Sequence, residues 1–148
     1  MTRVLRGIWT SLIWLFAIMI PIQFYLAGHG AMEGAHAADK AILPMKTAWD
    51  PHVAFGTLML LVSLLVLLTA LAARPPARLL GMSAGLFVLM IIQFVLPFFN
   101  DSASTRGIAA LHAVNALLIT GIIIGLIIRS RPYWPAFANG SEPGSATP

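Results

Sequence analysis

The sequence predicts an all-α integral membrane protein that folds as a four-helix up-down bundle. The chain has 148 residues, of which 59% are hydrophobic and 9% are charged, and its mean hydropathy is +0.88, far above the range of soluble globular proteins. Four apolar stretches each provide about the 20 residues that a helix needs to cross the hydrocarbon core of a bilayer. These predicted spans cover residues 8–27, 52–73, 79–99 and 107–128.

The first span follows two arginines, as the apolar part of a signal peptide would. Its apolar run is longer than the roughly 7 to 15 residues usual in a signal peptide, so we interpret it as a retained span. Residues 28–49 are rich in glycine and alanine and predict an outer loop. Within this loop the string ADKAILPM, residues 38–45, is expected to form a short interfacial helix.

Local signals mark the ends of the second span. Asp50 and Pro51 are suited to cap its start, because an aspartate side chain accepts hydrogen bonds from first-turn amides and proline is tolerated in that turn. Pro75 and Pro76 end the span, because proline cannot continue a helix, and they begin the turn to the third span.

Arginine placement predicts the orientation of the bundle. Six of the seven arginines fall on one side of the predicted membrane, and Arg106 falls on the other: the six are Arg3, Arg6, Arg74, Arg78, Arg129 and Arg131. Positive residues in short segments favour the cytoplasmic side, so both termini are predicted to be cytoplasmic. The tail 132–148 is rich in proline, glycine and serine and is predicted to be disordered. The net charge of +4 follows from this topology and does not indicate a nucleic-acid partner.

The chain contains an internal duplication. The first span includes LFAIMIPIQFYL (15–26) and the third includes LFVLMIIQFVL (86–96), which is nearly the same string without one proline. In the following spans, Lys46 precedes His52 by six residues and Arg106 precedes His112 by six residues. Two hairpins in the same orientation imply a pseudo-twofold axis along the membrane normal. The second and fourth spans then occupy opposite corners of the bundle, where their histidines face each other.

Polar side chains gather at one level of the predicted bundle. Gln23, Gln93 and His112 lie a few residues inside the outer ends of their spans, and His52 lies in the first turn of the second span. Polar groups at such depth are costly in a bilayer and usually face the bundle interior at a functional site. One glutamine or histidine from each helix therefore predicts a site near the outer face.

Two opposed imidazoles among aromatic rings suit a haem whose iron binds one histidine nitrogen on each side. The chain has no cysteine, which excludes covalent attachment of the haem, so we predict non-covalent haem b ligated by His52 and His112. Gly56 and Ala116, one turn after each histidine, would leave room for the porphyrin plane. The other expected haem contacts are Phe55, Asn115, Gln23 and Gln93, with Lys46 and Arg106 pairing with the propionates.

Other interpretations remain open for these residues. The glutamines are also typical of hydrogen bonds that join membrane helices, and a histidine can play the same part. The chain is then either a cofactor-free accessory or assembly subunit of a larger membrane complex, or a binder of quinone or another small solute. His29 and His36 stand in the predicted outer loop and are expected to be solvated rather than to bind a metal.

Three short motifs, QFYLAG (23–28), DPHVAFG (50–56) and LHAVNAL (111–117), resemble a family of small bacterial four-span membrane proteins of unassigned function. The paired histidines are also similar to those of small four-helix membrane b-type cytochromes. The resemblance implies a single-haem electron-transfer protein, or a redox subunit of an enzyme, in the bacterial inner membrane. Its expected partners are membrane lipid and either a quinone or a periplasmic redox protein. The chain departs from two-haem cytochromes because it lacks a second histidine pair towards the cytoplasm.

Overall fold

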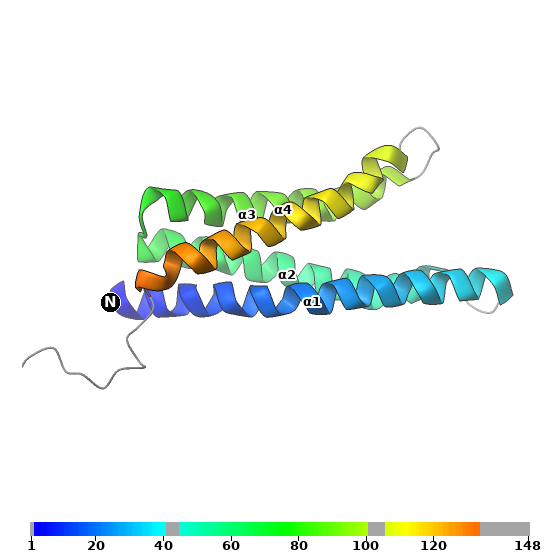
Figure 1. Cartoon of the computed structure of the whole chain (residues 1–148), viewed down its shortest axis with the longest axis horizontal. Coiled ribbons are helices and arrows are strands. Elements are labelled where there is room, and N and C mark those ends of the chain that lie inside the picture. The colour runs from blue at the N-terminus through cyan, green and yellow to red at the C-terminus, as the bar shows by residue number, and fades with distance from the viewer. Residues whose placement is uncertain (1, 41–44, 101–105, 134–148) are drawn as a thin grey trace, which may run out of the picture.

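A computed structural model of the chain describes residues 2–40, 45–100 and 106–133. These residues form four long α-helices and two short 3₁₀ helices (Figure 1). The elements are α1 (Thr2–Lys40), α2 (Met45–Ala73), α3 (Ala77–Val95), η1 (Leu96–Asn100), α4 (Arg106–Ser130) and η2 (Arg131–Tyr133). No strand is present in this part of the chain, so the predicted all-α fold class is confirmed.

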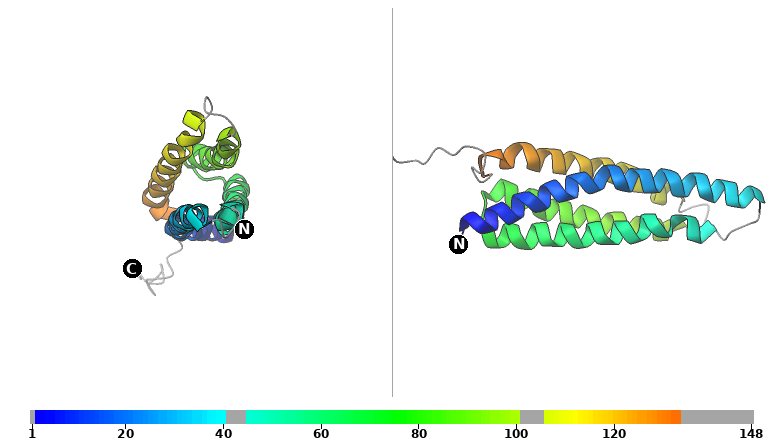
Figure 2. Two further views of the ribbon diagram at one scale, coloured as in Figure 1. Left: turned by 90° about the vertical axis from the view of Figure 1, so that its right-hand side faces the viewer. Right: turned by 90° about the horizontal axis from the view of Figure 1, so that it is seen from below.

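The four α-helices pack in sequence order around a ring, with α1 beside α2 and α4, and α3 beside α2 and α4 (Figure 2). Within the described residues, no backbone contact joins α2 to α4 or α1 to α3. The histidine-bearing helices α2 and α4 therefore occupy opposite corners of an up-down bundle, as the duplicated hairpins predicted.

All four helices are long and apolar enough to cross a membrane, and many large apolar side chains face outward from them. Such an exterior suits lipid and would be unfavourable in water. Polar side chains on the spans are satisfied locally: the hydroxyls of Thr57, Thr69 and Thr120 each donate to the carbonyl four residues earlier in the same helix. The chain is a multi-pass membrane protein.

The first hairpin is longer than predicted. Helix α1 does not end near residue 27 but continues to Lys40, and α2 begins at Met45 rather than at the expected cap, Asp50. The prediction of a long outer loop was wrong because Gly30 and Gly34, one turn apart, are both buried where α1 and α2 lie side by side. Close packing on this glycine face offsets the low helix propensity of glycine. Figure 1 shows this hairpin projecting beyond the outer end of α4.

The later start of α2 moves Pro51 and His52 inside the helix. Pro51 lies in the second turn, and His52 is the eighth residue of α2 and not a first-turn residue as predicted. His112 is the seventh residue of α4, so the two histidines lie at similar distances from the starts of their helices.

The third span also differs from its prediction. Helix α3 ends at Val95, and the last residues of the span, around Pro97, form the 3₁₀ helix η1 because proline lacks an amide hydrogen. The tail that was predicted to be disordered begins at residue 132, and its residues after 133 lie outside the described part of the chain.

The cores of the two bundle ends differ. One end of the bundle contains Arg6 on α1 and Arg74 directly after α2. Large apolar side chains fill the interior there, among them Trp9, Phe16, Val66 and Leu86. We call this half of the bundle the arginine end and the half that contains His52 and His112 the histidine end. Small residues bring α3 and α4 together at the arginine end, since a Cβ at Gly125 would lie 2.7 Å from the Met82 methyl group.

Helix α2 ends with a left-handed residue that is not glycine. Arg74 has a φ of 49°, and its amide donates to the Ala70 carbonyl at 2.9 Å. Glycine adopts this conformation without the steric cost of a Cβ, which is roughly 1 kcal/mol.

We therefore expect Arg74→Gly to raise the free energy of unfolding by up to about 1 kcal/mol, measured by thermal unfolding in detergent. The matched control is Arg78→Gly in the first turn of α3, which removes the same charge but costs about 0.5–1 kcal/mol. A loss of stability in Arg74→Gly would contradict this explanation.

Candidate functional site: a cavity between two histidines

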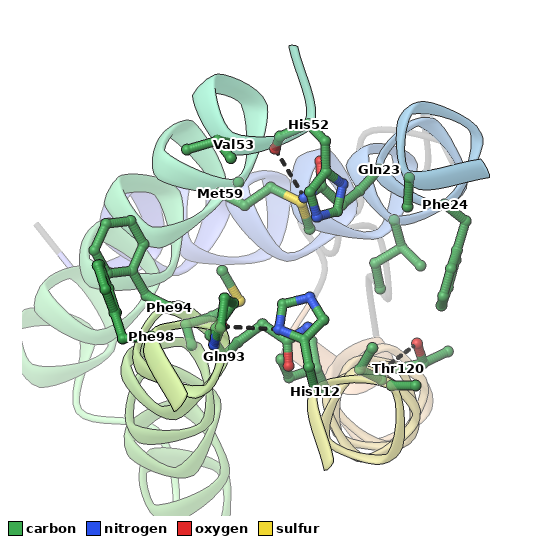
Figure 3. Close-up of a pocket in the computed structure, with 18 residues that line it drawn as sticks. Gln23, Phe24, His52, Val53, Met59, Gln93, Phe94, Phe98, His112 and Thr120 are labelled. Carbon is green, nitrogen blue, oxygen red and sulfur yellow. Dashed lines mark hydrogen bonds between the residues drawn. The ribbon is translucent and has the colours of Figure 1, made fainter. Parts of the chain in front are cut away.

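The four helices and η1 line a partly open cavity of about 890 Å³ at the histidine end (Figure 3). Its size lies in the range of small-molecule and cofactor sites. The residues that line it come from all four helices and from η1, and none of them is charged: Ile20, Gln23, Phe24, Ala27, His52, Val53, Gly56, Met59, Met90, Gln93, Phe94, Pro97, Phe98, His112, Ala113, Ala116, Ile119 and Thr120. Met59, Met90 and Ile119 are buried and close the cavity towards the bundle core.

The two predicted histidines meet inside this cavity. The ring centroids of His52 and His112 lie 6.1 Å apart with an angle of 61° between the ring planes. Both imidazoles point from opposite corners of the bundle towards its centre (Figure 3). Leucine packing does not separate them, because both rings line the same cavity.

A backbone carbonyl orients the ring of His112. Its Nδ1 lies 3.0 Å from the carbonyl oxygen of Gln93 on α3. A carbonyl oxygen only accepts hydrogen bonds, so Nδ1 carries the proton and donates it, which leaves Nε2 with its lone pair. Gln23 on α1 contacts the other histidine residue through its side chain, whose Nε2 donates to the backbone carbonyl of His52 at 3.1 Å.

The side chains of the two glutamines are held differently. Gln93 Oε1 accepts a 2.6 Å hydrogen bond from Asn115 Nδ2, which also lies 2.9 Å from the Leu89 carbonyl. Gln23 Nε2 instead donates to the His52 carbonyl at 3.1 Å. The Gln23 amide fits there because residue 56 is glycine: a Cβ at Gly56 would lie only 3.0 Å from Gln23 Nε2. Gly56 was predicted to leave room for the porphyrin plane. The structure shows that it also leaves room for the Gln23 amide.

The structure brings together six of the predicted site residues at the cavity: Gln23, His52, Gly56, Gln93, His112 and Ala116. Two others do not line it. Phe55 packs against the hydrophobic core, and Asn115 points into the contact between α3 and α4, where it fixes Gln93. Their helices are apolar on several faces, so spacing from the histidine did not reveal which way each side chain points. The side chains of Lys46 and Arg106 lie outside the described residues.

Sequence reasoning missed several lining residues. Met59, Met90 and Phe98 were not predicted as site residues. The structure shows that Met59 and Ile119 are separated by the same 60 residues as the two histidines, that Ile20 and Met90 are separated by the same 70 residues as the two glutamines, and that all four line the cavity.

His29 and His36 lie on α1 beyond its last cavity-lining residue, Ala27, and both are exposed. Among the residues that the structure describes, no group of three or more histidine or acidic side chains is placed to hold a bare metal ion. These two histidines are therefore useful as controls for experiments on the cavity.

Asn115 provides a test of the polar cluster. Asn115→Ala removes the hydrogen bonds to Gln93 Oε1 and to the Leu89 carbonyl, and we expect it to lower the free energy of unfolding by about 1 kcal/mol. Thr57→Ala is the control, because the Thr57 hydroxyl bonds only within its own helix and is exposed. Equal thermal unfolding temperatures for the two variants would contradict a role for Asn115 in holding α3 to α4.

Fold and site together define a four-helix, multi-pass membrane protein with a pair of half-buried histidines in a largely apolar cavity. The chain belongs to the DUF6220 family, a family of unknown function, whose sequence profile matches residues 23–100. This agrees with the expected resemblance to an uncharacterised family, and the matched segment includes Gln23, His52 and Gln93. No curated protein and no solved structure matches the chain.

Proposed function

We propose that the chain is a single-haem membrane cytochrome of b type, in which His52 and His112 ligate the iron. The separation of the two rings is the observation that carries this proposal. An imidazole nitrogen binds a transition metal at about 2 Å, so two imidazoles on opposite sides of one metal ion have ring centroids roughly 6 Å apart. The observed separation is 6.1 Å.

The hydrogen bond of His112 supports the same function. Metal-bound histidines usually donate their second ring nitrogen to a carbonyl or carboxylate, which fixes the ring and leaves the other nitrogen as the ligand. His112 Nδ1 donates to the Gln93 carbonyl in this way.

The cavity also suits a large apolar cofactor. It holds about 890 Å³, and the polar groups that line it are the two histidines, the two glutamines and Thr120. The small side chains at Gly56 and Ala116 lie one turn from the ligands, on the same helix faces. His52 and His112 would hold the haem, and the bound group would supply reversible one-electron transfer. The proposed partner is a quinone or a redox protein on the outer side of a bacterial inner membrane.

Optical spectra of the purified protein, oxidised and then reduced, test this function. The protein is expressed with added haem precursor, and the proposal requires a Soret band with the sharp α and β bands of low-spin haem on reduction. Absence of a Soret band would remove the cytochrome function. If quinone is then found in an organic extract, a quinone-binding protein is favoured; an extract without any ligand favours a cofactor-free accessory or assembly subunit.

A further inference from the structure

Nearly all the residues that line the cavity form pairs related by the internal duplication. Gln23 and Gln93 are 70 residues apart, and His52 and His112 are 60 residues apart, so we compare α1 with α3 and η1 at the first offset and α2 with α4 at the second. Sixteen of the 18 lining residues form pairs under these two offsets. The two exceptions are Phe98, whose counterpart is Gly28, and Thr120, whose counterpart is Leu60. The cavity is thus nearly symmetric, and the exceptions show where its two sides differ.

On two sides of the bundle, residues that line the cavity are also exposed on the surface, and we call these two places windows. The α1–α4 window is defined by Phe24 and Ala113, and the α2–α3 window is defined by Phe94 and Val53. All four residues line the cavity and are also exposed on the surface of the bundle; Phe24 is 49% exposed and Phe94 is 42% exposed. Since no lining residue is charged and the surrounding surface is apolar, both windows face lipid.

Only the α2–α3 window carries a second aromatic ring. Phe98 lies one turn beyond Phe94, with 6.0 Å between the ring centroids, and the two rings stand together beside α2 (Figure 3). At the equivalent place on α1, Gly28 has no side chain, and a Cβ added there would meet no atom within 4 Å. Figure 1 also shows α4 diverging from α1 towards the histidine end. The α1–α4 window is therefore the open one.

The α1 side of the cavity also offers a hydrogen-bond acceptor. Gln23 Nε2 donates to the His52 carbonyl, which fixes the orientation of the amide. Gln23 Oε1 is buried, and it accepts no hydrogen bond from any residue that the structure describes. Its counterpart on the other side, Gln93 Oε1, accepts from Asn115. A buried amide oxygen is stabilised by a donor, so this side of the cavity suits a ligand with a hydroxyl group.

We propose that the α1–α4 window admits the ring of a lipid-dissolved hydroquinone, whose hydroxyl donates to Gln23 Oε1. The ring lies along Phe24, and its apolar chain remains in the bilayer beside Gly28. Entry from lipid distinguishes this ligand from a soluble redox protein, which would approach from the aqueous side. The inference rests on the proposed function, because it names the membrane partner of that cytochrome.

The test measures binding of a decyl-substituted benzohydroquinone to the full chain in phospholipid nanodiscs, with empty nanodiscs subtracted. Gly28→Phe copies the ring of Phe98 into the open window, and we expect it to weaken binding at least tenfold. Gly81→Phe is the matched control: Gly81 is exposed, a Cβ there also meets no atom within 4 Å, and it lies at the arginine end. We expect the control to bind like the unmodified chain. Gly28→Phe that binds like the control would overturn the proposal.

Two further variants keep the test valid if Gly28→Phe fails to fold, which size-exclusion chromatography and circular dichroism would reveal. Gln23→Leu removes the acceptor and is expected to weaken binding about tenfold, the loss of one hydrogen bond. Phe98→Gly opens the second window, and an azido derivative of the hydroquinone should then label α3 and η1 in addition to α1. Unchanged binding in Gln23→Leu together with unchanged labelling in Phe98→Gly would refute the window.

The outcomes for the haem and for the window are separable. A chain with a low-spin haem spectrum whose hydroquinone binding is insensitive to Gly28→Phe refutes the window and leaves the cytochrome. A chain without a Soret band that loses hydroquinone binding in Gly28→Phe refutes the cytochrome and supports the window as a binding site.

Discussion

Replacement of His112 by alanine is expected to abolish low-spin haem binding. The variant removes one of two imidazoles whose ring centroids lie 6.1 Å apart, and with it the ligand that the Gln93 carbonyl orients. We expect the purified variant either to contain no haem or to contain haem with a high-spin spectrum, since only one axial ligand remains. The measurements are haem content per chain and the reduced-minus-oxidised optical spectrum.

His36→Ala is the matched control, because His36 is exposed on the projecting part of α1 and lies far from the cavity lining. It should leave the spectrum unchanged. His52→Ala should behave as His112→Ala does, because the two ligands act on one metal. Retention of an unchanged low-spin spectrum in His112→Ala would show that the histidine assignment is wrong, provided that circular dichroism shows the helices intact.

Trp9→Ala is expected to cause the largest loss of stability. Trp9 on α1 is fully buried, and its indole Nε1 donates to the Ser83 hydroxyl on α3 at 3.3 Å. These two helices lie at opposite corners and share no backbone contact within the described residues, so the indole fills the centre of the bundle at the arginine end. Truncation leaves a large cavity and removes the indole hydrogen bond, while the Ser83 hydroxyl still donates to the Leu79 carbonyl, and we expect a loss of about 3–5 kcal/mol.

The matched control for Trp9→Ala is Trp14→Ala, since Trp14 is 41% exposed on the outside of the same helix. Lipid replaces the lost contacts there, and we expect a change below about 1 kcal/mol. Trp9→Phe separates packing from hydrogen bonding: it keeps most of the volume and should cost about 1 kcal/mol. Reversible unfolding in mixed micelles measures all three variants. Similar losses for Trp9→Ala and Trp14→Ala would contradict the central packing role of Trp9.

Much of the fold was predictable because its causes are local. Each span needs enough consecutive apolar residues to cross the bilayer, and this requirement is visible in any window of the sequence. The repeated strings around Gln23 and Gln93 indicated two equivalent hairpins, which in turn placed His52 and His112 at opposite corners. The helix order and the meeting of the two rings followed from these two facts.

Other features were not predictable because they depend on contacts between helices. The outer part of α1 contains Gly30 and Gly34, which favour a loop by propensity, but their packing beside α2 extends the helix to Lys40. Phe55 and Asn115 occupy equivalent positions in the two hairpins, yet one packs in the core and the other bonds to Gln93. Helices that are apolar on several faces do not reveal which face turns inward.

The sequence by itself determined the number of spans, the duplicated hairpin and the choice of histidine and glutamine at one level of the membrane, since hydropathy and residue chemistry act along the chain. The tertiary structure alone decided which side chains line the cavity, which carbonyl holds His112, and that Phe94 and Phe98 pair their rings on one side of the cavity while the space around Gly28 is free. The physical reason is that helix rotation and spacing are set by the packing of neighbouring helices, and no single helix encodes them.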